Sequence, residues 1–409
     1  MSKTLTAARQ VVFDTDLVKR IKRLESLASP GSYATFQGGD DALVVTFHGG
    51  KGGEIESRRK FDVPCGAPFT FTIQGKSIMD ILKAFDEVTM TVKEKTLSFQ
   101  SGHSRMNRNI QTDAPEVVFP DFSKEELAPL PQTTFRDAAL ASYATAQGGE
   151  SDVAERVSIF LTKGSVSIVG TNGLMAVRVV SPSDYSGEDK EYLLHPRFID
   201  PLAPLSMKEG APTIFIGRTE RKYLVKFGEY EITSRIPASP SLRTAIEGNL
   251  NLMANSQTMG AAFDVDALLT FFERAKLLDV GATQVMPVVF MINPDEGVAL
   301  AKHKSPLGDI QDMFDIEVSG TPMPNMPLGF SLKYFTEACN HLRSDTAEMT
   351  IRSQRAPVTL AEKIEDTLIT HILLPVLPRT DEKELAAEKK TPAQTKDESS
   401  SVSPSDFED

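Results

Sequence analysis

The 409-residue sequence predicts an α+β protein made of three similar units, each with two helices packed on antiparallel sheets. Three observations lead to this prediction: landmarks that recur in the same order, hairpin patterns between them, and apolar stripes at helical spacing. Apolar residues make up 40% of the chain and charged residues 24%, as in ordinary globular proteins. A wholly disordered or collagen-like protein is therefore excluded.

The landmarks are spaced alike in each unit. The first is a phenylalanine opening an amphipathic helical pattern, the second an apolar pair in a second short helix, and the third an apolar residue before proline. The first and second lie 65, 63 and 71 residues apart, and the second and third 41, 38 and 40 residues apart. Such matched intervals indicate an internal repeat. The landmarks are Phe13, Ile78, Met79, Phe119 and Pro120; Phe135, Phe198, Ile199, Ile236 and Pro237; and Phe263, Tyr334, Phe335, Leu374 and Pro375.

Between the landmarks, short stretches alternate apolar and polar residues around polar turns, which is typical of antiparallel hairpins. The clearest are 88–102, 158–173, 213–236 and 288–303. Proline and small polar residues collect near 124–131 and 251–258, where we expect linkers. The predicted domains are 1–126, 127–253 and 254–379, followed by an acidic tail over 380–409.

The helical patterns place apolar residues on one face and cations on the other. In the first helix the apolar stripe comprises Leu17, Val18, Ile21, Leu24 and Ala28. Each basic face, taken alone, is equally compatible with a solvated helix. Their recurrence in an acidic protein favours one shared surface that attracts phosphates without distinguishing bases. The candidate DNA-facing residues are Lys19, Lys22, Arg23, Lys76, Lys83, Arg136, Arg197, Arg274, Lys333 and Arg343.

Composition and charge limit the class of protein further. The chain has only two cysteines, no run of about 18 apolar residues, and no signal-peptide pattern at its start, so we expect a cytoplasmic protein without a disulfide framework. The net charge of -12 argues against binding nucleic acid over the whole surface. It leaves open a protein that presents cations on one face.

No pattern indicates catalysis, a cofactor or a metal. The glycine-rich stretch 48–53 lacks the spacing of a phosphate-binding loop, and no helical pattern follows it at once. The six histidines are scattered, and no GxSxG elbow occurs. We therefore expect a protein that is not an enzyme and that needs no cofactor and no metal.

The acidic tail has Leu385, Val402 and Phe407 as its only bulky apolar residues. Such a segment buries too little surface to offset the entropy of ordering it, so the sequence predicts disorder. A solubilising tail is the simpler interpretation, and a partner-binding role for the terminal SDFED is the other.

Five segments together resemble the bacterial-type DNA sliding clamp family, the beta subunit of DNA polymerase III. The similarity is diffuse, but it extends over most of residues 1–379. No segment is specific alone, whereas the ordered set is. The segments are SGHSRMNRN (101–109), GTNGLMAVR (170–178), SPLGDIQDMFDIEVSG (305–320), GFSLKYFTEACNHL (329–342) and LLPVLPR (373–379).

The resemblance implies a head-to-tail homodimer that forms a ring around double-stranded DNA, with helices inside and sheets outside. Such a ring acts as a processivity factor that tethers a replicative polymerase and is placed on DNA by a clamp loader. The implied dimer interface uses Met106 and Arg108 on one side and Leu277 and Leu278 on the other. For the two leucines, a place in the core is the alternative. A trimeric ring also stays open, because subunit number depends on the interface angle.

The resemblance also implies an apolar groove for partner peptides between the second and third domains. Leu174 and Met175 replace a His-Arg pair that is common in the family, which favours a different peptide. This departure and the tail favour a divergent member, encoded by a phage or a plasmid. The groove residues are Thr171, Gly173, Leu174, Met175, Pro237, Arg243, Leu374, Pro375, Val376 and Leu377.

Two other classes of protein share the acidic, cysteine-poor composition. One is a non-enzymatic phage structural or assembly protein built of β-rich repeats. The other is a hydrolase, which the missing nucleophile and metal motifs disfavour.

Overall fold

The computed structural model describes residues 9–39, 41–50, 55–110, 116–117, 119–124, 126–145, 155–208, 210–237, 258–280, 286–323 and 327–376. Within these residues, no helix is long and apolar enough to cross a membrane. The predicted tail lies outside them, as do Arg243, Leu377 and most of the second predicted linker. The predicted domain boundaries stay predictions.

The first unit contains eight strands and two helices. Asp14 caps the first helix, because its carboxylate accepts a hydrogen bond from the Leu17 backbone amide at 2.7 Å. The predicted apolar stripe of that helix is buried from Leu17 to Leu24. The elements are β1 (Gln10–Asp14), α1 (Thr15–Ser26), β2 (Tyr33–Gly38), β3 (Leu43–His48), β4 (Ile55–Phe61), β5 (Phe69–Gln74), α2 (Gly75–Lys83), β6 (Glu87–Val92), β7 (Thr96–Ser101) and β8 (Ser104–Asn109).

The second unit repeats this order after a short 3-10 helix, η1 (Phe122–Lys124). Its two helices pack through an edge-to-face contact between Phe135 and Phe198, with ring centroids 6.0 Å apart. The elements are β9 (Leu127–Leu130), α3 (Thr134–Ser142), β10 (Val157–Thr162), β11 (Ser165–Thr171), β12 (Met175–Pro182), β13 (Lys190–Leu194), α4 (Pro196–Ser206), β14 (Ile214–Arg218), β15 (Lys222–Phe227) and β16 (Tyr230–Arg235).

The third unit has the same order and one additional strand, β21. Asp264 caps its first helix through the Ala267 amide at 2.7 Å, as Asp14 does in the first unit. The elements are β17 (Met259–Asp264), α6 (Val265–Leu278), β18 (Pro287–Asn293), β19 (Val298–Ser305), β20 (Gly308–Asp315), β21 (Glu317–Gly320), β22 (Pro327–Ser331), α7 (Leu332–Asn340), β23 (Thr346–Ile351), β24 (Val358–Ile364) and β25 (Thr367–Leu373).

The two halves of each unit interlock by exchanging their first strands. The strand before the first helix joins the sheet of the second half, in the pairs β1–β6, β9–β14 and β17–β23. The strand before the second helix joins the sheet of the first half, in the pairs β5–β2, β13–β10 and β22–β18. Each helix is therefore held against a sheet to which both halves contribute.

Two sheets run without interruption from one unit into the next. The pair β4–β16 makes an eight-stranded sheet of the first and second units, and β12–β25 makes a nine-stranded sheet of the second and third. In both sheets, the last strand from the first half of one unit pairs with the last strand from the second half of the next unit. At the two ends of the molecule, β20 occupies the position that β4 and β12 have in their units, and β8 the position that β16 and β25 have in theirs.

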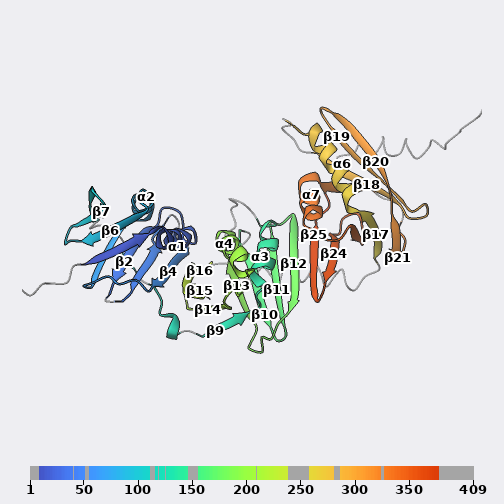
Figure 1. Cartoon of the computed structure of the whole chain (residues 1–409). Helices are drawn as coiled ribbons and strands as arrows, with labels where there is room; N and C mark the ends of the chain where they lie inside the picture. Colours follow the sequence, from blue (N-terminus) through green and yellow to red (C-terminus); the bar gives the residue numbers. More distant parts are fainter. Residues whose placement is uncertain are drawn as a thin grey trace, which may run out of the picture.

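The three units follow one another in an open arc, with the six described helices toward its concave side and the sheets toward its convex side (Figure 1). The sliding-clamp arrangement predicted for one chain is thus present: repeated units, each with two helices on antiparallel sheets.

One landmark was assigned to the wrong place. Phe13 and Phe263 are buried strand residues directly before the capping aspartates, whereas Phe135 lies inside α3. Leu130 is the residue of the second unit that corresponds to Phe13. Val11 and Ala128 each face the middle of the partner strand, and Phe13 and Leu130 each lie two residues after them. The second landmarks all lie in α2, α4 and α7, as predicted.

Candidate functional site

The predicted DNA-facing cations are mostly exposed residues of the helices along the concave side. Lys19, Lys22 and Arg23 lie on α1, and Lys76 and Lys83 on α2. Arg197, Arg274 and Lys333 are exposed on α4, α6 and α7, and Arg343 is exposed in the loop after α7. The exposed cations outnumber the exposed acids most clearly in the first unit, where α1 and α2 offer five against Asp16 and Asp80.

Three of these cations already have acidic neighbours. Arg136 is half-buried, and its guanidinium forms an ion pair with the buried Asp137 at 2.9 Å, so its charge is largely neutralised. Lys22 pairs with Glu25 at 2.6 Å. Arg274 lies 3.5 Å from Asp312 on β20. Exposed pairs of this kind are weak, and a phosphate can replace the carboxylate.

The two ends of the three-unit arc expose apolar side chains. Met106, on β8, is 39% exposed, and Leu277, at the end of α6, is 69% exposed. Leu277 is therefore not a core residue, contrary to the alternative interpretation of this leucine. Leu278 is half-buried. Val280, Leu307 and Met313 of the same unit are also exposed, and they were not predicted from the sequence.

The end strands also carry opposite charges. Arg105 and Arg108 lie on β8, and Asp309, Asp312 and Asp315 lie on β20. All the side chains of β8 are exposed. A strand edge that is unpaired and exposed is prone to pair with another strand, and the two charge patterns are complementary.

The predicted peptide groove contains an exposed apolar patch, which we define as Leu174, Leu374 and Val376. These side chains are 52%, 38% and 40% exposed. The Leu374 amide donates to the Leu174 carbonyl at 3.0 Å, so the strand pairing of β12 with β25 continues into the patch. Next along the chain, the Val376 amide donates to the Gly329 carbonyl at 2.8 Å.

The loop before β12 presents Leu174 to solvent. The Asn172 side chain accepts hydrogen bonds from the amides of Leu174 and Met175, both at 2.9 Å. Gly173 has a φ of +86°, a conformation that glycine adopts without strain. Met175 and Pro237 are buried, whereas Thr171 and Pro375 are half-buried. Arg243 and Leu377 lie outside the described residues.

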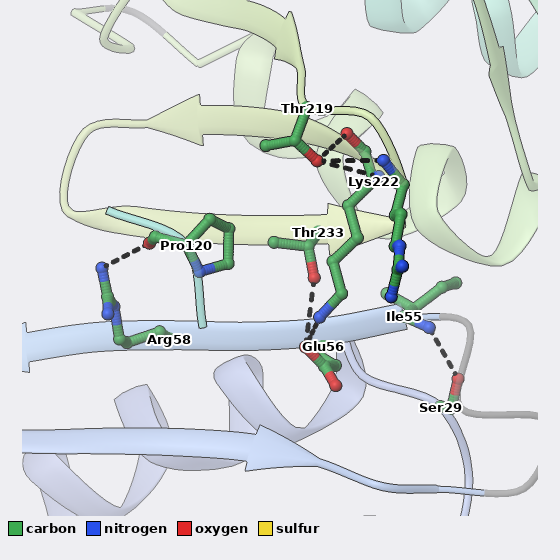
Figure 2. Close-up of polar contacts among 9 residues, drawn as sticks. Ser29, Ile55, Glu56, Arg58, Pro120, Thr219, Lys222 and Thr233 are labelled. Atoms are coloured by element: carbon green, nitrogen blue, oxygen red, sulfur yellow. Dashed lines mark hydrogen bonds and ion pairs between the residues drawn. The ribbon is translucent and has the colours of Figure 1, made fainter. Parts of the chain in front are cut away.

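The junction of the first and second units is rich in ion pairs. Figure 2 shows Lys222 and Thr233 reaching the same carboxylate, that of Glu56, at 2.6 and 3.4 Å. Arg58 forms an ion pair with Glu231 across the β4–β16 pair and also donates to the Pro120 carbonyl at 3.4 Å. A third pair joins Arg59 to Glu229 at 2.9 Å.

The junction of the second and third units contains a cluster of three rings that was not predicted from the sequence: His371 is buried, and Tyr143 and His341 are half-buried. The Tyr143 hydroxyl and His371 Nδ1 are joined by a hydrogen bond at 2.5 Å, and the Tyr143 ring stacks on His341 with centroids 3.9 Å apart. Burial lowers the pKa of His371 to about 4, and the nearby His341 adds to this shift. Burial also raises the pKa of Tyr143. Both groups are therefore neutral at pH 7.

Both cysteines are buried and free, as expected for thiols that serve as small apolar residues. Burial raises the pKa of Cys339 to about 12, so this thiol stays protonated. Among the described residues, no group of three or more His, Cys, Asp or Glu side chains is arranged to hold a metal ion.

The chain is similar to solved structures of bacterial replication proteins. A DNA polymerase III subunit beta from Pseudomonas aeruginosa matches with a TM-score of 0.76 and 16% identity, over 90% of this chain and 99% of that one. A DNA polymerase III beta chain from Streptococcus pneumoniae matches with a TM-score of 0.77 and 15% identity, over 91% and 99%. A DNA polymerase sliding clamp from Bacillus subtilis matches with a TM-score of 0.77 and 16% identity, over 91% and 100%.

No protein-family model and no curated protein sequence matches the chain. The likeness is thus one of three-dimensional structure, and it covers nearly the whole length of each protein compared. The chain has the DNA sliding-clamp fold, in a sequence that has diverged far from those of the solved clamps.

Proposed function

We propose that this protein is a DNA sliding clamp: two copies join head to tail into a ring that encircles duplex DNA and tethers a polymerase to it. The observation that carries the proposal is that both junctions within the chain have the same strand register, which predicts a third junction between chains. A ring of this kind catalyses no reaction. It acts because dissociation from DNA requires opening an interface between subunits.

The register follows from equivalent residues in the first halves of the units. Ala34, Val157 and Val288 each face a residue that lies two positions before the second helix of the unit. Each of these three residues also faces a residue of the next strand, and that residue in turn faces one on the strand after it. The residues reached in this way are Ser57 on β4, Val177 on β12 and Ile310 on β20.

The second halves give matching positions. Met90, Ile216 and Met349 lie in the middle of the strand that follows the second helix of their unit. Each faces a residue of the next strand, which in turn faces a residue of the last strand. The residues reached in this way are Met106 on β8, Ile232 on β16 and His371 on β25.

The two intrachain junctions agree on how these positions meet. Ser57 faces Ile232 in the first junction, and Val177 faces His371 in the second. By the same rule, Ile310 of one protomer faces Met106 of its partner. Ser57, Ile232, Val177 and His371 are all fully buried, whereas Met106 is partly exposed in the single chain. Pairing with a second copy would bury it as its counterparts are buried, and the arginines of β8 would approach the aspartates of β20.

The concave side suits a duplex that slides. Its exposed lysines and arginines attract phosphates over a distance of about 10 Å at moderate salt, without contacts to base edges. The acidic remainder of the molecule discourages DNA from binding elsewhere. The patch at the second junction is the candidate docking site for the polymerase and for the clamp loader, because exposed apolar patches mark protein-binding surfaces.

The ring and its topology can be tested in one experiment. A variant with Met106→Cys and Ile310→Cys is mixed with nicked circular DNA and then oxidised. We expect a covalently closed ring that stays with the circle in denaturing detergent and is released when the circle is cut to a linear molecule. Cys65 and Cys339 are buried, so they should not interfere.

The matched control pairs Met106→Cys with Met313→Cys, three positions from Ile310 and on the opposite face of β20. We expect little cross-linking there. If the control cross-links as well as the designed pair, the proposed register is wrong. If the designed pair closes but the ring washes off circular DNA, the protein does not encircle DNA.

A further inference from the structure

The patch Leu174, Leu374 and Val376 has a second candidate occupant within the same chain. We propose that the end of the acidic tail, residues 397–409 with Phe407 as its apolar anchor, docks on the patch and competes there with partner peptides. The inference rests on the proposed function only in taking the patch to be the partner-docking site.

The patch is the exposed end of a small apolar cluster on one face of the nine-stranded sheet. Val169, Ala176 and Ile372 form this cluster, separate from the main core. Ala176 faces Ile372 across the β12–β25 pair, and the next positions on the same face are Leu174 and Leu374. An incoming aromatic side chain would therefore extend an existing apolar layer instead of starting a new one.

The described chain leads directly to this place. Val376, the last described residue, is itself part of the patch, and 33 residues follow it. Figure 1 shows β25 lying beside β12 at the junction where the patch is formed. Phe407 lies 31 positions after Val376 in the sequence, a length that spans at most about 110 Å when extended. A flexible chain of that length has a root-mean-square span of roughly 30 Å.

Tethering makes weak docking effective. Because the tail starts at the patch, its end is held near the patch at an effective concentration on the order of a millimolar. Residues 397–409 contain two bulky apolar side chains, Val402 and Phe407, five acidic residues and no basic one. Arg178 lies on β12 two residues after Ala176, on the same face as the patch, and so places a cation beside an acidic peptide.

The test uses a fluorescently labelled synthetic peptide of residues 397–409 as the probe and measures its anisotropy. A protein ending at Arg379 should bind the peptide, and the full chain should bind it about tenfold more weakly because its own tail occupies the patch. Leu374→Asp in the shortened protein should abolish binding. Leu368→Asp is the matched control, since Leu368 lies on the same strand with similar exposure but outside the patch, and it should leave binding unchanged.

Phe407→Ala in the full chain should restore binding of the probe to the level of the shortened protein. No binding to the shortened protein, or equal binding to the full and shortened proteins, would overturn the inference. Retention on circular DNA should be the same for the full chain, the shortened protein and the Phe407→Ala variant. A tail that fails to dock while the rings stay on circles refutes only this inference, whereas loss of retention in every protein refutes the proposed function.

Discussion

The two junctions inside the chain have the same strand register but different chemistry. At the first junction, the contacts are ion pairs such as Glu56 on β4 with Lys222 on β15 and Arg58 on β4 with Glu231 on β16. Across β12–β25, most of the facing residues are apolar, as in the buried pair Val179 and Ile369, and Tyr143 reaches His371 from the end of α3. The backbone geometry of a junction is therefore compatible with either kind of side chain. The difference predicts that the first junction responds to salt and the second to pH.

The largest expected effect is the pH response of the second junction. His371 has a pKa of about 4 in the folded protein, against about 6.5 in an unfolded chain, so the unfolded chain binds a proton that the folded one excludes between these values. The free energy of unfolding is therefore at its full value above pH 6.5, and it decreases by about 3 kcal/mol as the pH falls toward 4. Hydrogen exchange of the β25 amides at pH 7, 5.5 and 4.5 measures the loss.

The matched control is His48 in the first unit, which is also buried. Burial lowers the pKa of His48, but the nearby Glu56 opposes the shift. His371→Gln should remove most of the pH response of β25, and His48→Gln should leave it in place. A β25 response that survives His371→Gln would show that another group controls the junction.

A smaller effect is expected from the hydroxyl that reaches His371. Tyr143→Phe leaves the ring stack on His341 but removes the partner of His371 Nδ1. A buried polar atom without its partner costs about 1–3 kcal/mol, so exchange of the β12–β25 amides should accelerate. Tyr185→Phe is the control, because the Tyr185 hydroxyl donates to the Glu188 carbonyl at an exposed site, and it should change exchange little. Equal effects from the two variants would contradict the role given to Tyr143.

The smallest expected effect concerns the ion pairs of the first junction. A double-mutant cycle with Glu56→Gln and Lys222→Met should give a coupling energy of about 1 kcal/mol or less, because both side chains are partly exposed. Raising sodium chloride from about 0.05 to 0.5 M should reduce it further. The effect of Tyr143→Phe should not change with salt. A coupling energy that is insensitive to salt would remove the distinction between the junctions.

The local patterns in the sequence predicted much of the fold. The hairpins at 88–102 and 158–173 are β6–β7 and β10–β11, and the stripe from Leu17 to Leu24 is buried in α1. The misplaced landmark at Phe135 has a physical reason: a buried phenylalanine suits a strand end and a helix equally, so its presence does not decide between them.

The candidate sites were predicted less completely. Leu174, Leu374 and Met106 were identified through the resemblance, and their exposure supports a role in binding. The ion pair of Arg58 with Glu231 spans 173 residues and the contact of Tyr143 with His371 spans 228, and neither has a local signal. The three aspartates of β20, at 309, 312 and 315, could have indicated a partner for the arginines of β8.

By itself, the sequence determined which segments form helices and strands and that the pattern occurs three times, because periodicity and helix capping act between residues a few positions apart. Only the tertiary structure decided which strand ends meet. An alternating strand presents the same two faces to every possible neighbour, so its partner and register depend on which distant side chains complete the buried layer and which charges lie opposite.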